Sequence, residues 1–68
     1  METEYSYQVG YLLNWNANDP EFSTLGECFR FTKYEDPDMV HTYGIWTGQK
    51  QGSELVAIVH EGQYFKAF

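Results

Sequence analysis

The chain has 68 residues, a formal net charge of −6 and aromatic side chains at 19% of its positions. A chain this short forms one small domain, predicted to span residues 1–68, and its single cysteine excludes an internal disulfide. Four basic residues are too few for direct binding to nucleic acid, which needs clustered Lys and Arg, and no apolar run is long enough to span a membrane.

Alternating apolar residues near the amino end predict a long β-strand over residues 4–15. Side chains on a strand alternate between its two faces, so residues two apart share a face. Every odd position from 5 to 15 is apolar: Tyr5, Tyr7, Val9, Tyr11, Leu13 and Trp15. We therefore expect a half-buried strand with an aromatic inner face, and a bend at Gly10 because glycine lacks a Cβ.

A loop rich in Asn and Asp follows this strand. Asp19 and Pro20 are typical of the start of a helix and Gly26 is typical of its end, so a short helical turn is predicted near residues 20–25. Residues 27–34 return to alternation and are predicted to form the second strand.

The remainder of the chain is predicted to form three strands, over residues 39–47, 53–60 and 63–68. A glycine-bounded loop separates the first two of these strands. The turn between the last two, Glu61 and Gly62, suits a tight hairpin, because glycine tolerates the positive φ that such a turn requires.

The register of the glycine-loop hairpin decides where the two histidines lie. If the hairpin is symmetric about the Lys50–Gln51 bond, His41 faces His60, with about 4.5–5.5 Å between the two Cβ atoms. A register shift of one residue, which the loop permits, separates the two side chains. The sequence leaves both registers open.

Five strands joined mostly by short turns predict an all-β fold, with the helical turn near residues 20–25 as its one departure. The strands are expected to form an antiparallel meander. This meander is either curled into a small barrel or laid out as an open sheet, and the hydrophobic pattern fits both arrangements.

Few residues are candidates for chemistry. Cys28 is the only thiol, and neither a neighbouring His nor a glycine-flanked turn activates it as a nucleophile. Zinc takes three or four ligands, and only Cys28 or Glu61 could join His41 and His60 to complete such a set. We therefore predict a protein that is not an enzyme and has no metal or other cofactor. The alternative is a small metal- or thiol-dependent sensor or catalyst that uses Cys28, His41 and His60.

The acidic residues are unevenly distributed. Residues 1–38 hold eight acidic and two basic side chains, whereas residues 39–68 hold two of each. This skew, together with more aromatic side chains than a small core can bury, predicts a surface that contacts a basic protein. The predicted contact residues are Asp19, Glu21, Glu27, Tyr34, Glu35, Asp36, Asp38 and Trp46.

The predicted function is a non-catalytic protein-binding module or a small inhibitor. It docks this surface onto a basic protein, including one that itself binds nucleic acid, as small proteins of phages or mobile elements do. A structural homodimer, with the surplus aromatic side chains buried against a second copy, is a further alternative. The lone cysteine and an amino end without an export signal predict a cytoplasmic location.

Overall fold

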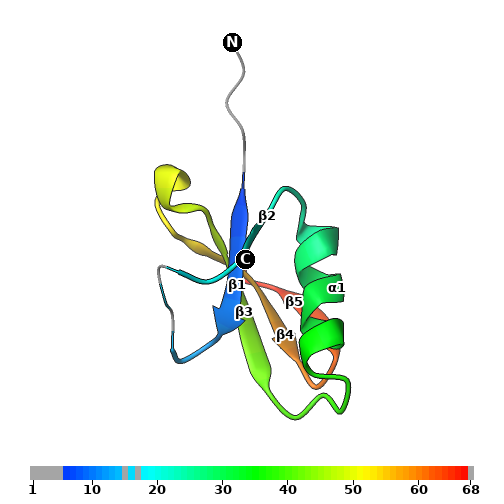
Figure 1. Cartoon of the computed structure of the whole chain (residues 1–68). Coiled ribbons are helices and arrows are strands. Elements are labelled where there is room, and N and C mark those ends of the chain that lie inside the picture. Colours follow the sequence, from blue (N-terminus) through cyan, green and yellow to red (C-terminus); the bar gives the residue numbers. More distant parts are fainter. Residues whose placement is uncertain (1–5, 15, 17, 68) are drawn as a thin grey trace.

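A computed structural model describes residues 6–14, 16 and 18–67 of the chain. In this part of the protein five antiparallel strands form one sheet, and a helix packs on one of its faces (Figure 1). The elements are β1 (Tyr7–Tyr11), β2 (Glu21–Phe22), α1 (Leu25–Glu35), β3 (Thr42–Thr47), the 3-10 turn η1 (Gln49–Gln51), β4 (Leu55–His60) and β5 (Gln63–Lys66).

The sheet is open, with the strand order β2-β1-β3-β4-β5. The two edge strands do not meet, so the sheet forms no barrel. The predicted meander holds only for β3, β4 and β5, because β1 is inserted between β2 and β3. The fold is mostly β, as predicted, but it also contains a full helix.

The first strand is shorter than predicted within the described residues. β1 covers Tyr7–Tyr11 and ends in a turn at Leu12 and Leu13. Tyr5 and Trp15, the outer members of the predicted aromatic face, lie outside the residues that the structure describes.

The predicted second strand over residues 27–34 is wrong, because this segment is part of helix α1. A capping box begins the helix: Thr24 Oγ1 accepts the Glu27 backbone N–H at 3.2 Å, and Glu27 Oε1 accepts the Thr24 backbone N–H at 3.2 Å. The helical turn predicted near residues 20–25 is also wrong, because Glu21–Phe22 forms strand β2 and pairs with β1.

Replacing Thr24 by alanine is expected to destabilise the protein by about 1 kcal/mol, because the first turn of α1 loses its side-chain acceptor. The matched control is Ser23→Ala. Ser23 meets Glu27 through its backbone N–H, at 3.1 Å, and alanine keeps that donor. Urea denaturation of both variants checks the prediction, and equal losses of stability would contradict it.

The core lies between the sheet and α1. On each central strand, alternate residues point toward α1. From the helix, Cys28, Leu25 and Phe29 pack against them. The buried members of this cluster are Val9, Cys28, Tyr43, Ile45, Ala57 and Val59. No helix among the described residues has the length and apolar character needed to cross a membrane.

A β-bulge sets the register of the β3–β4 hairpin. Near the loop the predicted register is correct, since Trp46 pairs with Leu55 and the Thr47 N–H donates to the Glu54 carbonyl at 2.8 Å. Val56 is then an extra residue on β4, so the next pair is Ile45 with Ala57.

Beyond this bulge every pair is shifted by one residue from the symmetric register. Thr42 therefore lies opposite His60. His41 does not face His60, and the symmetric version of the hairpin is wrong at this end.

Candidate partner-binding surface

The two histidines make separate contacts. His60 Nδ1 lies 2.8 Å from Thr42 Oγ1, whereas the His41 ring lies 5.0 Å from the Tyr11 ring, measured between centroids. Among the described residues, no group of three or more His, Cys, Asp or Glu side chains is arranged to hold a metal ion. This part of the molecule therefore offers the metal-sensor alternative no ligand set.

Cys28 is a core residue and not an exposed nucleophile. Its side chain is fully buried. Burial, and secondarily the negative charge of Glu27, raise the pKa of the thiol from 9.0 to about 12. A reactive cysteine needs the opposite change, because the thiolate is the nucleophile. The thiol of Cys28 is therefore protonated at neutral pH and serves packing.

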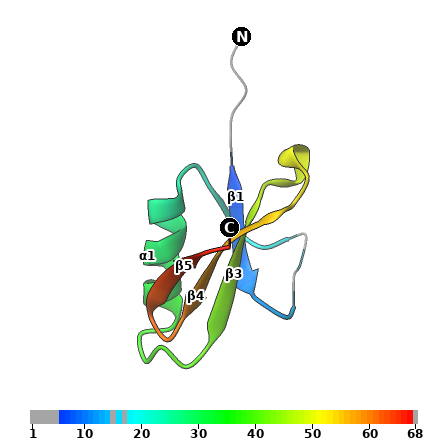
Figure 2. The same ribbon diagram turned by 180° about the vertical axis from the view of Figure 1, so that it is seen from behind.

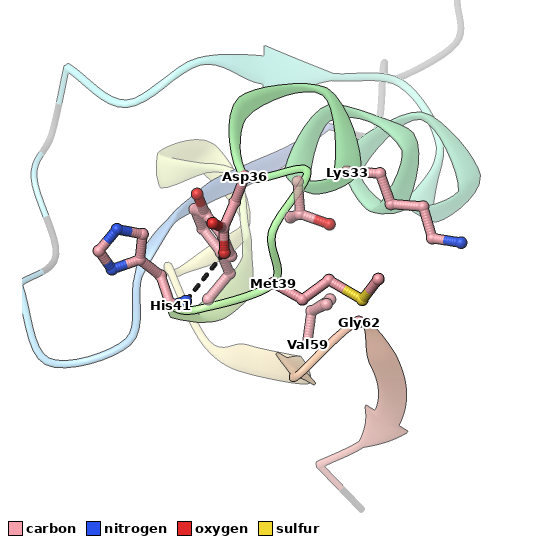
Figure 3. Close-up of a pocket in the computed structure, with 8 residues that line it drawn as sticks. Lys33, Asp36, Met39, His41, Val59 and Gly62 are labelled. Atoms are coloured by element: carbon pink, nitrogen blue, oxygen red, sulfur yellow. Dashed lines mark hydrogen bonds between the residues drawn. The ribbon is translucent and has the colours of Figure 1, made fainter.

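Two of the predicted contact residues are buried. Asp36 follows α1, and its Oδ2 accepts the backbone N–H of His41 at 2.8 Å, which ties the end of the helix to the segment before β3 (Figure 3). Trp46 lies over Gly44, where a Cβ would be 2.7 Å from its ring. Asp36 and Trp46 therefore hold the fold together and do not belong to the accessible surface.

The other predicted contact residues lie at or near the surface. Tyr34 is 80% exposed, and Glu21, Glu35 and Asp38 are also exposed. Asp19 and Glu27 are half-buried. The Glu27 carboxylate already accepts hydrogen bonds from the backbone N–H groups of Ser23 and Thr24, just before α1, so it is held at the amino end of the helix.

A cavity of about 310 Å³ is lined by two of these acidic residues and by two tyrosines. We call it the acidic pocket. It lies between the second half of α1 and the connection from β1 to β2. Its walls include Asp19 and Glu35 on the acidic side, and Tyr11, Tyr43 and Phe31 on the aromatic side. None of the described residues that line it is basic.

The tyrosines of the acidic pocket form a stacked pair, with ring centroids 5.3 Å apart and 28° between the ring planes. The pKa of Tyr43 is raised to about 12, first by burial and then by nearby negative groups that include Asp36 and Glu35. Burial disfavours the charged phenolate, and the negative charges of Asp36 and Glu35 disfavour it further. The pocket therefore combines aromatic ring surface with an excess of negative charge.

Gly10 allows the acidic pocket to form. It lies within β1, opposite Gly44, so it is a regular strand residue and not the predicted bend. A Cβ at Gly10 would lie on the face of β1 away from α1 and would overlap the carboxylate of Asp19 there. The Asp19 carboxylate is therefore on the opposite face of β1 from the rings of Tyr11 and Tyr43. The Asp19 carboxylate in turn accepts the Asn16 backbone N–H at 3.2 Å, which fixes the loop over the strand. Glycine is needed here for the close approach of a side chain.

A second depression, the outer groove, lies next to the acidic pocket, between α1 and β2. It has a volume of about 300 Å³ and is lined by Phe22, Glu27, Arg30, Phe31 and Tyr34. The rings of Phe22 and Phe31 are 5.3 Å apart between centroids and form its apolar floor. Because Phe31 lines both depressions, the outer groove and the acidic pocket are neighbours on one surface.

Comparison of the chain with protein-family models, with curated proteins and with solved structures finds no match. The chemistry of the surface itself is therefore the basis for assigning a function. Sequence reasoning identified its acidic members and Tyr34, but missed Tyr11, Tyr43 and Phe31 as pocket walls. The sequence feature that could have indicated this pocket was a glycine, Gly10, within a predicted strand that is followed by a loop rich in Asn and Asp.

Proposed function

We propose that the protein is a non-catalytic binding module that docks its acidic, aromatic surface onto a basic protein partner. The acidic pocket is the observation that carries this proposal. The residues Asp19 and Glu35 line a cavity of about 310 Å³ together with the exposed ring of Tyr11, which stacks on the buried ring of Tyr43.

A Lys or Arg side chain of the partner suits this pocket. Its cationic head can pair with a carboxylate, and a guanidinium can do so through two parallel hydrogen bonds. The exposed ring of Tyr11 adds a cation–π attraction, which strengthens when water is excluded. The exposed ring of Tyr34 at the neighbouring outer groove provides the kind of aromatic anchor that is enriched at binding hot spots.

The net charge supports the same partner. A charge of −6 attracts basic surfaces over several ångströms and accelerates their association at low salt. Proteins that bind nucleic acid carry extended basic surfaces. An inhibitor that covers such a surface is the specific form of this proposal.

The test is capture of partners from a cell lysate by the immobilised protein and by a double variant, Asp19→Asn with Glu35→Gln. Asparagine keeps a side-chain oxygen for the Asn16 N–H, so the loop contact is preserved. We expect the double variant to bind its partner at least about tenfold more weakly, because two lost charge pairs at on the order of 1 kcal/mol each exceed the roughly 1.4 kcal/mol of a tenfold change.

A matched control removes the same charge elsewhere, with Glu54→Gln and Glu61→Gln. Both residues are exposed and lie outside the acidic pocket. The control should bind as the unmodified protein does, and high salt should release the partner from both. Equal losses in the two double variants, or binding that resists salt, would contradict the proposal.

A further inference from the structure

The carboxy-terminal strand forms the edge of the sheet beside the helix, on the side of the sheet away from β2 (Figure 2). β5 pairs with β4, and none of the described residues forms a strand beyond it. A groove of about 190 Å³ lies between this strand and the first half of α1. We call it the edge groove, and Leu25, Gly26, Phe29 and Tyr64 line it.

The hydrogen-bonding pattern shows which backbone groups face outward from β5. The Ala67 N–H donates to the Val56 carbonyl at 3.0 Å, directly beyond the pair of Lys66 with Ala57. Hydrogen-bonded and non-hydrogen-bonded pairs alternate along an antiparallel ladder. The backbone N–H and C=O groups of Tyr64 and Lys66 therefore point away from β4, toward the open edge.

The side chains of these same two residues lie on the helix side of the sheet. Tyr64 pairs with the core residue Val59, and its ring lies 5.9 Å from the ring of Phe29, measured between centroids. A strand added along β5 would thus place the residue opposite Tyr64 over the edge groove. Alternate residues of such a strand would face α1.

Gly26 keeps the edge groove open, although the fold does not require glycine there. A Cβ at this position would have only Thr24 Oγ1 within reach, at 4.0 Å. Glycine is among the least favourable residues in a helix. The missing side chain therefore costs helix stability and gains no packing within the described part of the chain, but it gives an incoming side chain access to Phe29.

The charge at this edge is opposite to that of the molecule as a whole. Lys33 Nζ lies 5.0 Å from the centroid of the Phe29 ring, and Lys66 shares the helix-facing side of β5 with Tyr64. Within the described part of the chain, no carboxylate lines the edge groove. Lys33 and Lys66, two of the four basic residues of the chain, thus lie beside the β5 edge.

We propose that the β5 edge binds an extended acidic segment of a partner protein as an additional antiparallel strand. An apolar side chain of the segment enters the edge groove opposite Tyr64, and a carboxylate two residues earlier lies opposite Lys66. A second copy of β5 fits less well, because it would bring another lysine and no carboxylate to this edge. This surface is separate from the acidic pocket, so it adds a second binding function.

The experiment is an NMR titration of the full chain with the acetylated and amidated peptide Thr-Glu-Thr-Leu-Thr. We expect the backbone amide signals of Tyr64 and Lys66 to shift most along β5, because their N–H groups gain acceptors. A short linear peptide is expected to bind with a dissociation constant near 1 mM, so the titration extends to about 5 mM. Peptides with Lys in place of Glu, or Ser in place of Leu, should bind at least about fivefold more weakly.

Protein variants test the same contacts from the other side. Gly26→Leu should weaken binding of the peptide by about tenfold, because the leucine side chain fills the edge groove. Gly26→Ala should weaken it less, because alanine fills only a small part of the groove. Lys66→Glu should reverse the preference between the Glu and Lys peptides. Lys50→Glu, the same change in the η1 turn, should leave that preference unaltered.

Three outcomes would overturn the proposal. The first is an absence of shifts at Tyr64 and Lys66 with the unmodified protein, which needs no variant to fold. The second is equal affinity for the Glu and Lys peptides. The third is a dimer in sedimentation that the peptide fails to dissociate, because the edge would then belong to a second copy.

Discussion

Replacing Ile45 by alanine is expected to remove most of the stability of the folded protein at 25 °C. Ile45 is completely buried at the centre of the sheet, where β3 pairs with Val9 of β1 and Ala57 of β4. Truncation of a fully buried Ile to Ala costs about 2–5 kcal/mol, because contacts are lost and a cavity remains. A core of this size contributes about 3–5 kcal/mol of net stability in all.

Circular dichroism and urea denaturation check this prediction. Val40 provides the control, because it is also apolar but 72% exposed in the segment before β3. Val40→Ala should change the free energy of unfolding by less than about 0.5 kcal/mol. A cooperative transition of nearly unchanged midpoint in Ile45→Ala would show that the core is centred elsewhere.

Alkaline conditions are expected to unfold the protein well below pH 12. The pKa of Cys28 is raised from 9.0 to about 12 and that of Tyr43 from 10.0 to about 12, mainly by burial. Both groups hold their protons more tightly in the folded state. Their stabilising contribution is therefore complete below the pKa of the unfolded chain and is lost as the pH rises toward the folded value.

The size of this loss is large for so small a domain. A shift of three pKa units corresponds to on the order of 4 kcal/mol for Cys28 alone, since each unit is about 1.36 kcal/mol. Urea midpoints measured from pH 7 to pH 11 check the prediction. In Cys28→Ala the free energy of unfolding should no longer fall between pH 9 and pH 10. In this interval the thiol ionises in the unfolded chain before the phenol does. Identical profiles for Cys28→Ala and the unmodified protein in this interval would contradict it.

The second half of the sheet was predictable from local signals. Apolar runs placed β3, β4 and β5 within a few residues, and Glu61 with Gly62 forms the two-residue turn that was expected. Both have positive φ, 51° and 78°, as such a turn requires. Here each local preference agrees with the final structure, so the pattern alone was sufficient.

The helix shows how one pattern can hide another. Phe29, Arg30 and Phe31 alternate as in a strand, but Leu25, Cys28, Phe29 and Thr32 also have the i, i+3, i+4, i+7 spacing of a helix. Thr24 and Glu27 supplied the capping-box signature that decides between the two. The helical spacing of apolar residues is therefore present in the sequence, and in the folded protein it prevails over the strand-like alternation of Phe29 and Phe31.

The bulge and the acidic pocket depend on contacts that no local pattern reports. Nothing around Val56 distinguishes a bulged residue from a regular strand residue, so the separation of His41 from His60 follows only from the completed ladder. The acidic pocket forms because the loop with Asp19 folds back over Gly10, which is a tertiary contact. Its carboxylates were predicted from composition, whereas its tyrosine walls were not.

The open sheet has a consequence for how the protein can be used. Its two edge strands, β2 and β5, are separated by four steps between neighbouring strands, or about 19 Å at 4.8 Å per step. If both proposed surfaces bind their ligands, these ligands would not compete for space, and one copy of the protein would bridge two other chains. A rigid bridge of this length raises the effective concentration of one of them around the other, even when each individual affinity is modest.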